Sequence, residues 1–149
     1  ETDLVLNGMG LRKKAVFKVY VAGLYLQQKQ TDPQAILASD SPRKLVMQFL
    51  RKVGSDSLTG AWDDCLKGNS PSASPAVKQG FESLKGFMAD VKKKDQLEFT
   101  YDPAVGTTVT VAGQKQGPVA GKDFADARFA CWVGAVPPSE DFKEGLLGR

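Results

Sequence analysis

A short cationic run, Arg12-Lys13-Lys14, directly precedes the most apolar stretch of the chain, residues 15–26. Both alternating sets of residues in this stretch are mostly apolar. That pattern predicts a long β-strand that is covered on both faces and lies in the centre of a sheet. Just upstream, Asn7-Gly8-Met9-Gly10 predicts a turn, because glycine accepts a positive φ without steric cost. A cation held at the end of a buried strand is the clearest functional signal in the sequence, and the alternative is a surface arginine beside two lysines.

The residue inventory excludes several other classes of site. The chain has no histidine and only two cysteines, Cys65 and Cys131, without CxxC spacing. It therefore lacks a Ser-His or Cys-His nucleophile pair and the ligands of an ordinary zinc site, and we expect no metal. There is no P-loop and no GxGxxG motif, so we also expect no cofactor. The net charge of +3 over 149 residues is small and scattered, which argues against nucleic acid as a partner.

The elements that must position the cationic run follow from periodicity and breaker residues. We expect strands at residues 15–26, 44–51, 97–101 and 105–112, a short edge strand at 114–119, and helices that begin near Pro33, at Ser55 or Ser57, near Val77, at Lys122 and at Ser139. The helix over 122–133 is nearly all apolar and must therefore be buried on several sides.

This order of strands, helical block, hairpin and closing helices predicts an α+β fold, as a single domain over residues 1–149. Helices should gather on one face of an antiparallel sheet, and an apolar cleft between the two layers is the expected ligand site. No apolar run reaches the roughly 18 residues that cross a bilayer, so we expect a soluble domain without a membrane span. The start at Glu1-Thr2-Asp3 has no methionine. We expect a chain that is periplasmic or secreted after removal of an export signal, or otherwise cytoplasmic.

Three segments of the chain resemble the chalcone isomerase fold family, in particular its bacterial chalcone isomerase-like members. They are residues 6–12 (LNGMGLR) with 17–26 (FKVYVAGLYL), the less specific helical middle, and residues 124–134 (FADARFACWVG) with the closing 146–148 (LLG). The resemblance covers most of the chain. It implies an open-faced β-sandwich, in which helices are layered on one face of a large antiparallel sheet.

The resemblance also implies roles for particular residues. In the plant enzymes, which cyclise a chalcone to a flavanone, the key arginine follows a Gly-x-Gly-x turn, and Arg12 matches that position. A guanidinium fixed in a dry cleft stabilises a developing anion. The strand threonine of those enzymes falls on Tyr20 and their late-helix threonine falls on Cys131. The fatty-acid-binding branch of the fold instead holds a carboxylate with an arginine and a tyrosine at the positions of Arg12 and Tyr20, and this sequence is closer to that pattern.

We therefore expect a ligand site made of Arg12, Tyr20, Cys131 and Lys18, with Arg12 as the catalytic residue only if the protein is an enzyme. Lys18 interrupts an otherwise apolar set of positions, so it lies either at the wet end of the strand or in the pocket as a second cation. Tyr20 can alternatively be a core tyrosine.

Three functions remain open from the sequence: a protein that binds a fatty acid or similar amphipathic carboxylate, an intramolecular lyase or isomerase of an aromatic enone, and a ligand-free interaction domain. The expected partner is a small amphipathic or aromatic molecule, and the oligomeric state is left open. We expect no useful chalcone cyclisation, because Arg12 alone supplies charge stabilisation without near-attack geometry.

Two further pairs of residues have structural interpretations. Trp62 and Trp132 lie among apolar helical neighbours and are expected to be core residues rather than stacking platforms. Cys65 and Cys131 also lie on apolar helical faces, where a free cysteine acts as a small hydrophobic residue. Their helices should cover the same face of the sheet, so a disulfide is the alternative, but we expect two free thiols. A disulfide would instead indicate an oxidising compartment.

Overall fold

The computed structural model describes residues 3–149, so the first two residues of the Glu1-Thr2-Asp3 start lie outside the described part. Within it, the strands form one six-stranded antiparallel sheet in the order β1-β2-β3-β4-β5-β6, so that strands adjacent in sequence are also adjacent in space. The strands are β1 (Val5–Lys14), β2 (Phe17–Leu26), β3 (Arg43–Phe49), β4 (Gln96–Asp102), β5 (Gly106–Val111) and β6 (Gln114–Val119). The helices are α1 (Pro33–Ala38), α2 (Ser55–Asn69), α3 (Pro75–Phe87), α4 (Lys122–Val133) and α5 (Glu140–Leu146).

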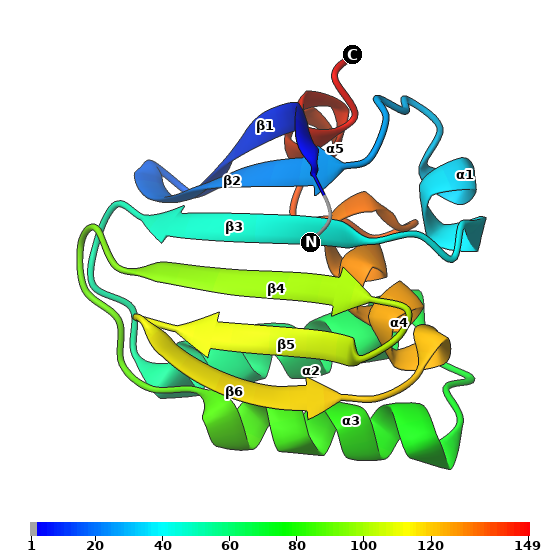
Figure 1. The fold of residues 1–149 in the computed structure, drawn as a ribbon. Helices are drawn as coiled ribbons and strands as arrows, with labels where there is room; N and C mark the ends of the chain where they lie inside the picture. Colours follow the sequence, from blue (N-terminus) through cyan, green and yellow to red (C-terminus); the bar gives the residue numbers. More distant parts are fainter. Residues whose placement is uncertain (1–2) are drawn as a thin grey trace.

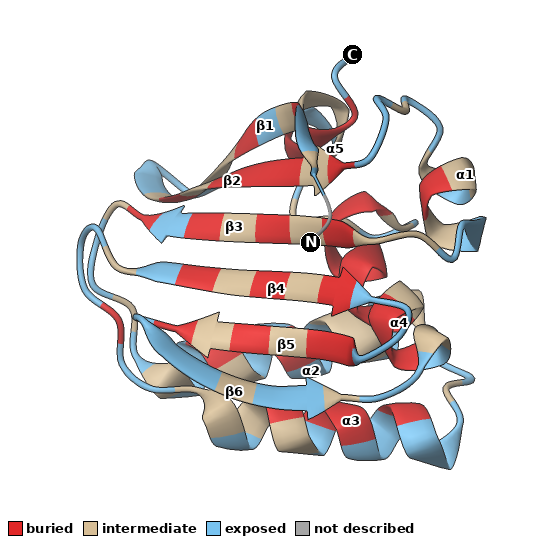
Figure 2. Ribbon diagram, in the orientation of Figure 1, coloured by how far each residue is buried: buried red, intermediate tan, exposed pale blue. Residues whose placement is uncertain are grey.

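The helices α2, α3 and α4 lie behind one face of the sheet, and the other face is open (Figure 1). The core lies between these layers. Along β4, for example, Leu97, Phe99 and Tyr101 are buried, whereas Glu98 and Thr100 are only half-buried on the open face, and Figure 2 shows this alternation on the central strands. The predicted α+β fold, an open-faced β-sandwich with helices on one face of a large antiparallel sheet, is confirmed.

The predicted turn at Asn7-Gly8-Met9-Gly10 is wrong, because these residues belong to β1. Their glycines allow α5 to lie directly against the strand: a Cβ at Gly8 would overlap the carbonyl oxygen of Gly145. The Asn7 side chain reinforces this contact, since its Nδ2 donates to the carbonyl of Leu146 at 2.9 Å. The glycines therefore serve a close helix–strand approach rather than a change of chain direction.

The prediction that residues 15–26 form a central strand covered on both faces is also wrong. Ala15 and Val16 form the β1–β2 turn, with Ala15 at φ 55, and β2 is the second strand from an edge. Tyr20, Ala22 and Leu24 face the core, as β2 alternation requires. Of the opposite set, Val21 and Tyr25 are half-buried on the open face of the sheet, so their apolar character does not indicate a second covering layer.

Capping side chains fix the starts of two helices that the sequence predicts. Asp32 and Ser139 each accept a hydrogen bond from a backbone N–H in the first turn of α1 and α5. The start of α2 differs, because Gly54 is its N-cap and no side chain of the helix caps it. Instead, the carboxylate of Asp90, distant in sequence, accepts from the backbone N–H of Ser55 at 2.8 Å.

The two cysteines are joined, so the expectation of two free thiols is wrong. Cys65 in α2 and Cys131 in α4 form a disulfide with a Cα–Cα distance of 5.3 Å. The sequence placed both residues on helices over one sheet face but could not show that the two helices are neighbours. Their contact brings the cysteines within bonding distance.

Candidate functional site

A cavity of about 520 Å³ lies between the β1–β2 hairpin, the end of β3, and helices α2 and α4. Its volume is within the range of small-molecule sites in proteins. Its wall is largely apolar and includes Met47, Phe49, Leu58, Trp62 and Trp132. This is the cleft between sheet and helices where the sequence places a ligand.

Arg12 and Tyr20 are brought together at this cavity, which both residues line. They are direct partners in the β1–β2 register, and directly opposed residues of antiparallel strands project from the same face. The Nη1 of Arg12 donates to the carbonyl oxygen of Pro138 at 3.0 Å, which holds the half-buried guanidinium against the loop between α4 and α5.

Tyr20 is almost fully buried, and its ring packs between Phe49 and Phe142 at centroid distances of 5.6 and 5.8 Å. Burial raises the pKa of Tyr20 to about 12, against smaller lowering effects from the Trp132 indole and the positive charge of Arg12. The phenol is therefore neutral at physiological pH, and its hydroxyl can donate a hydrogen bond to an anion.

The cavity has a strong excess of positive charge. Four cationic side chains contribute to its lining and only one acidic side chain does so: Arg12, Lys14, Arg51 and Lys52 against Asp64. Within residues 3–149, none of the four cations forms an ion pair with an acidic side chain. Arg51 instead lies over the ring of Phe17, 4.3 Å from its centroid. An anion entering this cavity would meet cations that lack a protein counter-ion.

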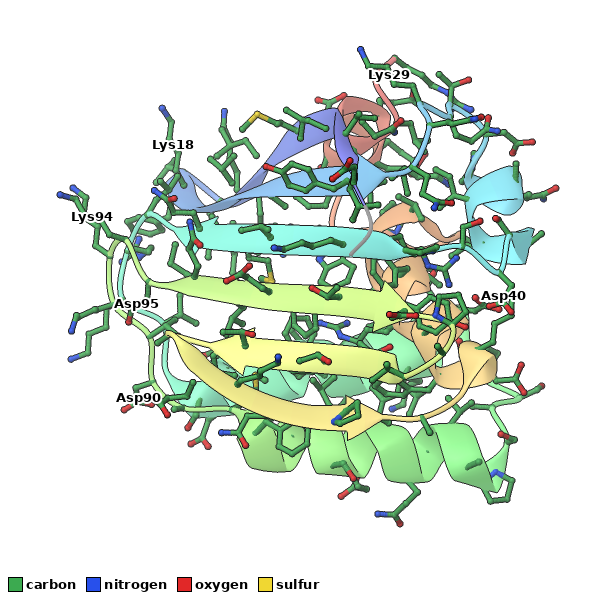
Figure 3. The ribbon with its side chains drawn as sticks, in the orientation of Figure 1. Lys18, Lys29, Asp40, Asp90, Lys94 and Asp95 are labelled. Atoms are coloured by element: carbon green, nitrogen blue, oxygen red, sulfur yellow. A yellow bond between two sulfur atoms is a disulfide. The ribbon has the colours of Figure 1, made fainter. Side chains whose placement is uncertain are left out.

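The other two predicted ligand residues are placed differently. Cys131 lines the cavity, but as one half of the disulfide with Cys65, which also lines it. Lys18 is exposed near the β1–β2 turn, where its strand partner is Lys13, and it is not a lining residue. Figure 3 shows Lys18 projecting away from the body of the sheet. Lys18 therefore lies at the solvent-exposed end of the strand and not in the pocket as a second cation.

Arg128, a buried residue next to the cavity wall, was not predicted from the sequence. Arg128 in α4 is 0% exposed, and its Nε, Nη1 and Nη2 all lack a hydrogen-bond partner among the described residues. Its Cζ lies 3.8 Å from the ring centroid of Trp62 and 4.2 Å from those of Phe99 and Trp132. Burial lowers the pKa of this guanidinium well below its ordinary value. The available signal was a single arginine within a helix already expected to be buried on several sides.

The two tryptophans connect Arg128 to the cavity. The prediction that Trp62 and Trp132 are core residues is confirmed, since they are 4% and 1% exposed, and both also line the cavity. The indole Nε1 of Trp62 is buried without a partner in the described structure. The described residues contain no group of three or more His, Cys, Asp or Glu side chains that could hold a metal ion.

An apolar cavity with a cationic lining, set between an antiparallel sheet and helices, is typical of a site for a small amphipathic molecule. The chain belongs to the chalcone isomerase-like family, whose family model matches residues 1–148. Among solved structures, the fold is similar to that of a fatty-acid binding protein from Arabidopsis thaliana. That match has a TM-score of 0.75 and 18% sequence identity, and it covers 97% of this chain and 87% of the plant chain. No curated protein sequence matches the chain significantly. No helix in residues 3–149 is long and apolar enough to cross a membrane.

Proposed function

We propose that this protein binds a fatty acid or a similar amphipathic carboxylate in the cavity between sheet and helices, without catalysing a reaction on it. The observation that carries the proposal is the charge of the cavity: an apolar wall with four cations, one acid and no ion pair between the cations and acidic residues of the described chain. Lys14, Arg51 and Lys52 are exposed to solvent, whereas the guanidinium of Arg12 is half-buried against the apolar wall. A charge in that setting is stabilised by a counter-ion, and a carboxylate with an alkyl chain suits both Arg12 and the wall.

The carboxylate binds between Arg12 and Tyr20. Only Nη1 of Arg12 has a protein partner among residues 3–149, so the remaining N–H groups of the guanidinium are free to donate to carboxylate oxygens. The neutral phenol of Tyr20 donates a further hydrogen bond. The alkyl chain then lies along the apolar wall that Met47, Phe49 and Leu58 supply.

The similarity to a plant fatty-acid binding protein supports the same ligand class, although at 18% identity the match itself concerns the fold. Lys18 takes no part in the proposed site, because it lies outside the cavity lining. Cys131 contributes apolar surface only, since its sulfur is bonded to Cys65.

Comparison of Arg12→Ala with the matched variant Lys18→Ala tests this proposal. Both changes remove one positive charge from the β1–β2 hairpin, but only the first removes a cavity side chain. We expect Arg12→Ala to weaken dodecanoate binding by at least tenfold, about 1.4 kcal/mol, and to leave dodecanol binding nearly unchanged. Lys18→Ala should change neither affinity appreciably, and isothermal titration calorimetry measures all of them.

Three results would contradict the proposal. Equal losses for the acid and the alcohol in Arg12→Ala would show that the side chain shapes the cavity rather than binding the carboxylate. Equal losses of dodecanoate affinity in both variants would show that only the general positive field of the hairpin matters. A failure of the wild-type protein to bind dodecanoate would leave the ligand-free interaction domain as the better account.

The isomerase alternative, with Arg12 stabilising the anion, has less support. The plant enzymes have threonines at the positions that match Tyr20 and Cys131. In this chain Tyr20 is bulky and buried, and the sulfur of Cys131 is held in the disulfide. Reaction requires near-attack geometry as well as charge stabilisation. We expect chalcone absorbance to decay at the spontaneous rate in the presence of the protein. A faster decay that Arg12→Ala abolishes would establish the enzyme.

The disulfide also supports a proposal about location. Disulfides persist in oxidising compartments and are rare where thiol reductants are abundant. We therefore assign the protein to the periplasm or the extracellular space rather than the cytoplasm. Alkylation of free thiols in intact cells before lysis tests this: Cys65 and Cys131 should resist alkylation, and labelling of both would contradict the assignment.

A further inference from the structure

We infer that Arg128 is a second anion-binding residue of the cavity, which binds the ligand carboxylate from the core side while Arg12 binds it from the β1–β2 hairpin. This inference rests on the proposed function and adds a residue that neither the sequence signals nor the family resemblance indicates. It starts from an uncompensated charge. The Arg128 guanidinium is completely buried, and all three of its nitrogens lack an acceptor within residues 3–149.

The surroundings of Arg128 supply donors and rings but no acceptor. Trp62, Phe99 and Trp132 stack around its Cζ at 3.8 to 4.2 Å, which stabilises the positive charge through cation–π attraction. The Nε1–H of Trp62 is a further buried donor without a partner. A cluster of unsatisfied donors is complementary to a ligand that brings only acceptors, and an ionised carboxylate has two acceptor oxygens and no donor.

The described structure contains a second buried arginine, Arg43, whose two terminal nitrogens have protein partners although its Nε, like that of Arg128, has none. Arg43 in β3 is also nearly inaccessible and also lies over two aromatic rings, those of Tyr101 and Phe129. However, its Nη1 donates to the carbonyl oxygen of Ile36 at 2.7 Å, and its Nη2 forms an ion pair with Asp126. Arg128 also lies against aromatic rings, but it has neither a carbonyl acceptor nor an acidic partner. A bound anion could therefore act as its counter-ion.

The position of Arg128 is consistent with a ligand contact. Trp62 and Trp132, on which it stacks, both line the cavity, and Tyr20 is within electrostatic range of both Arg128 and Arg12. Arg128 itself is behind this wall and is not a lining residue. Binding therefore includes a small movement of an indole ring, which lets one carboxylate oxygen reach the guanidinium from the side of Tyr20.

The test is the variant Arg128→Met, which keeps a long side chain but removes the charge. We expect dodecanoate affinity to fall at least about tenfold, with dodecanol affinity within about twofold of wild type. Thermal unfolding of the ligand-free variant should occur at the same temperature or higher, because replacing an unpaired buried charge by an apolar side chain of similar size is neutral or stabilising. Arg43→Met is the matched control: it should lower the unfolding temperature, because it removes both the ion pair with Asp126 and the buried hydrogen bond to the carbonyl of Ile36.

A purely structural role for Arg128 predicts different results. Arg128→Met would then lower the unfolding temperature and weaken acid and alcohol binding equally, and either outcome overturns the inference. If Arg128→Met does not fold, Trp62→Phe replaces it in the test. This variant retains a ring over Arg128 but removes the Nε1–H donor. We expect it to lose about fivefold in dodecanoate affinity and nothing in dodecanol affinity, and an unchanged ratio of the two affinities overturns the inference.

The Arg12→Ala variant separates failure of this inference from failure of the proposed function. If wild-type protein does not bind dodecanoate at all, both fail. If Arg12→Ala weakens dodecanoate binding but Arg128→Met does not, only the inference fails. If both arginines bind one carboxylate, the double variant should lose less affinity than the two single losses combined, because the second change removes a partner from an anion that is no longer held in place.

Discussion

Removal of the disulfide by the double substitution Cys65→Ala and Cys131→Ala should lower the free energy of unfolding by about 4 kcal/mol. The two cysteines are separated by 66 positions in the sequence. In the chain-entropy model, a crosslink over a loop of that length restricts the unfolded chain by about 15 cal/mol/K, or about 4 kcal/mol at 25 °C. Single domains have only about 5–15 kcal/mol of stability in total, so the expected loss is a large fraction of it.

Urea unfolding of three samples measures this loss: wild-type protein without reductant, wild-type protein with reductant, and the double variant. The two uncrosslinked samples should agree, and both should unfold at lower urea concentration than the oxidised protein. Their m-values should also be larger, because an unfolded chain without the crosslink exposes more surface. Equal midpoints for the oxidised protein and the double variant would refute the entropy argument. Two free thiols in denatured, non-reduced wild-type protein would refute the disulfide itself.

The remaining predictions concern the contact between β1 and α5 and the buried phenol of Tyr20. Gly8→Ala should destabilise the protein by several kcal/mol in urea unfolding, since its Cβ would overlap the backbone of Gly145, whereas Gly60→Ala in α2 has open space and should stabilise by about 0.5–1 kcal/mol. A Gly8→Ala variant as stable as wild type would show that α5 does not lie tightly on β1. Burial raises the pKa of Tyr20 from 10.0 to about 12, so the folded state holds this proton more tightly than the unfolded chain. The resulting stability is complete below pH 10 and is lost as the pH rises to about 12. Over this range the stability difference between wild type and Tyr20→Phe should shrink by up to about 2.7 kcal/mol, and a pH-independent difference would contradict the raised pKa.

Much of the fold is predictable from local pattern. The alternation of Leu97, Phe99 and Tyr101 with polar residues identifies β4 and its buried face, and Asp32 and Ser139 identify two helix starts through their capping bonds. The failures have tertiary causes. The glycines at the start of β1 have the composition of a turn, and only the packing of α5 explains why a strand contains them.

The candidate site was predictable in part. The cationic run before an apolar strand led to Arg12, and the family resemblance led to Tyr20, which proves to be its direct strand partner. The pairing of Cys65 with Cys131 and the contribution of Arg51 to the cavity depend on how distant segments meet, which periodicity does not report. Arg128 was missed because an arginine is expected at a surface, and nothing local marks the ring cluster that surrounds it.

The central claim, that the cavity holds a carboxylate against the guanidinium of Arg12, is tested most directly by NMR of bound dodecanoate labelled with ¹³C at its carboxyl carbon. We predict one bound resonance per protein chain, whose carboxyl stays ionised to a lower pH than free dodecanoate does, because neighbouring positive charges lower the pKa of a carboxylic acid. The bound resonance of Arg12→Ala should titrate at a higher pH than that of wild type. A bound carboxyl that titrates at or above the pH of the free acid, as burial in an uncharged apolar cavity would cause, or the absence of any bound resonance, would contradict the claim.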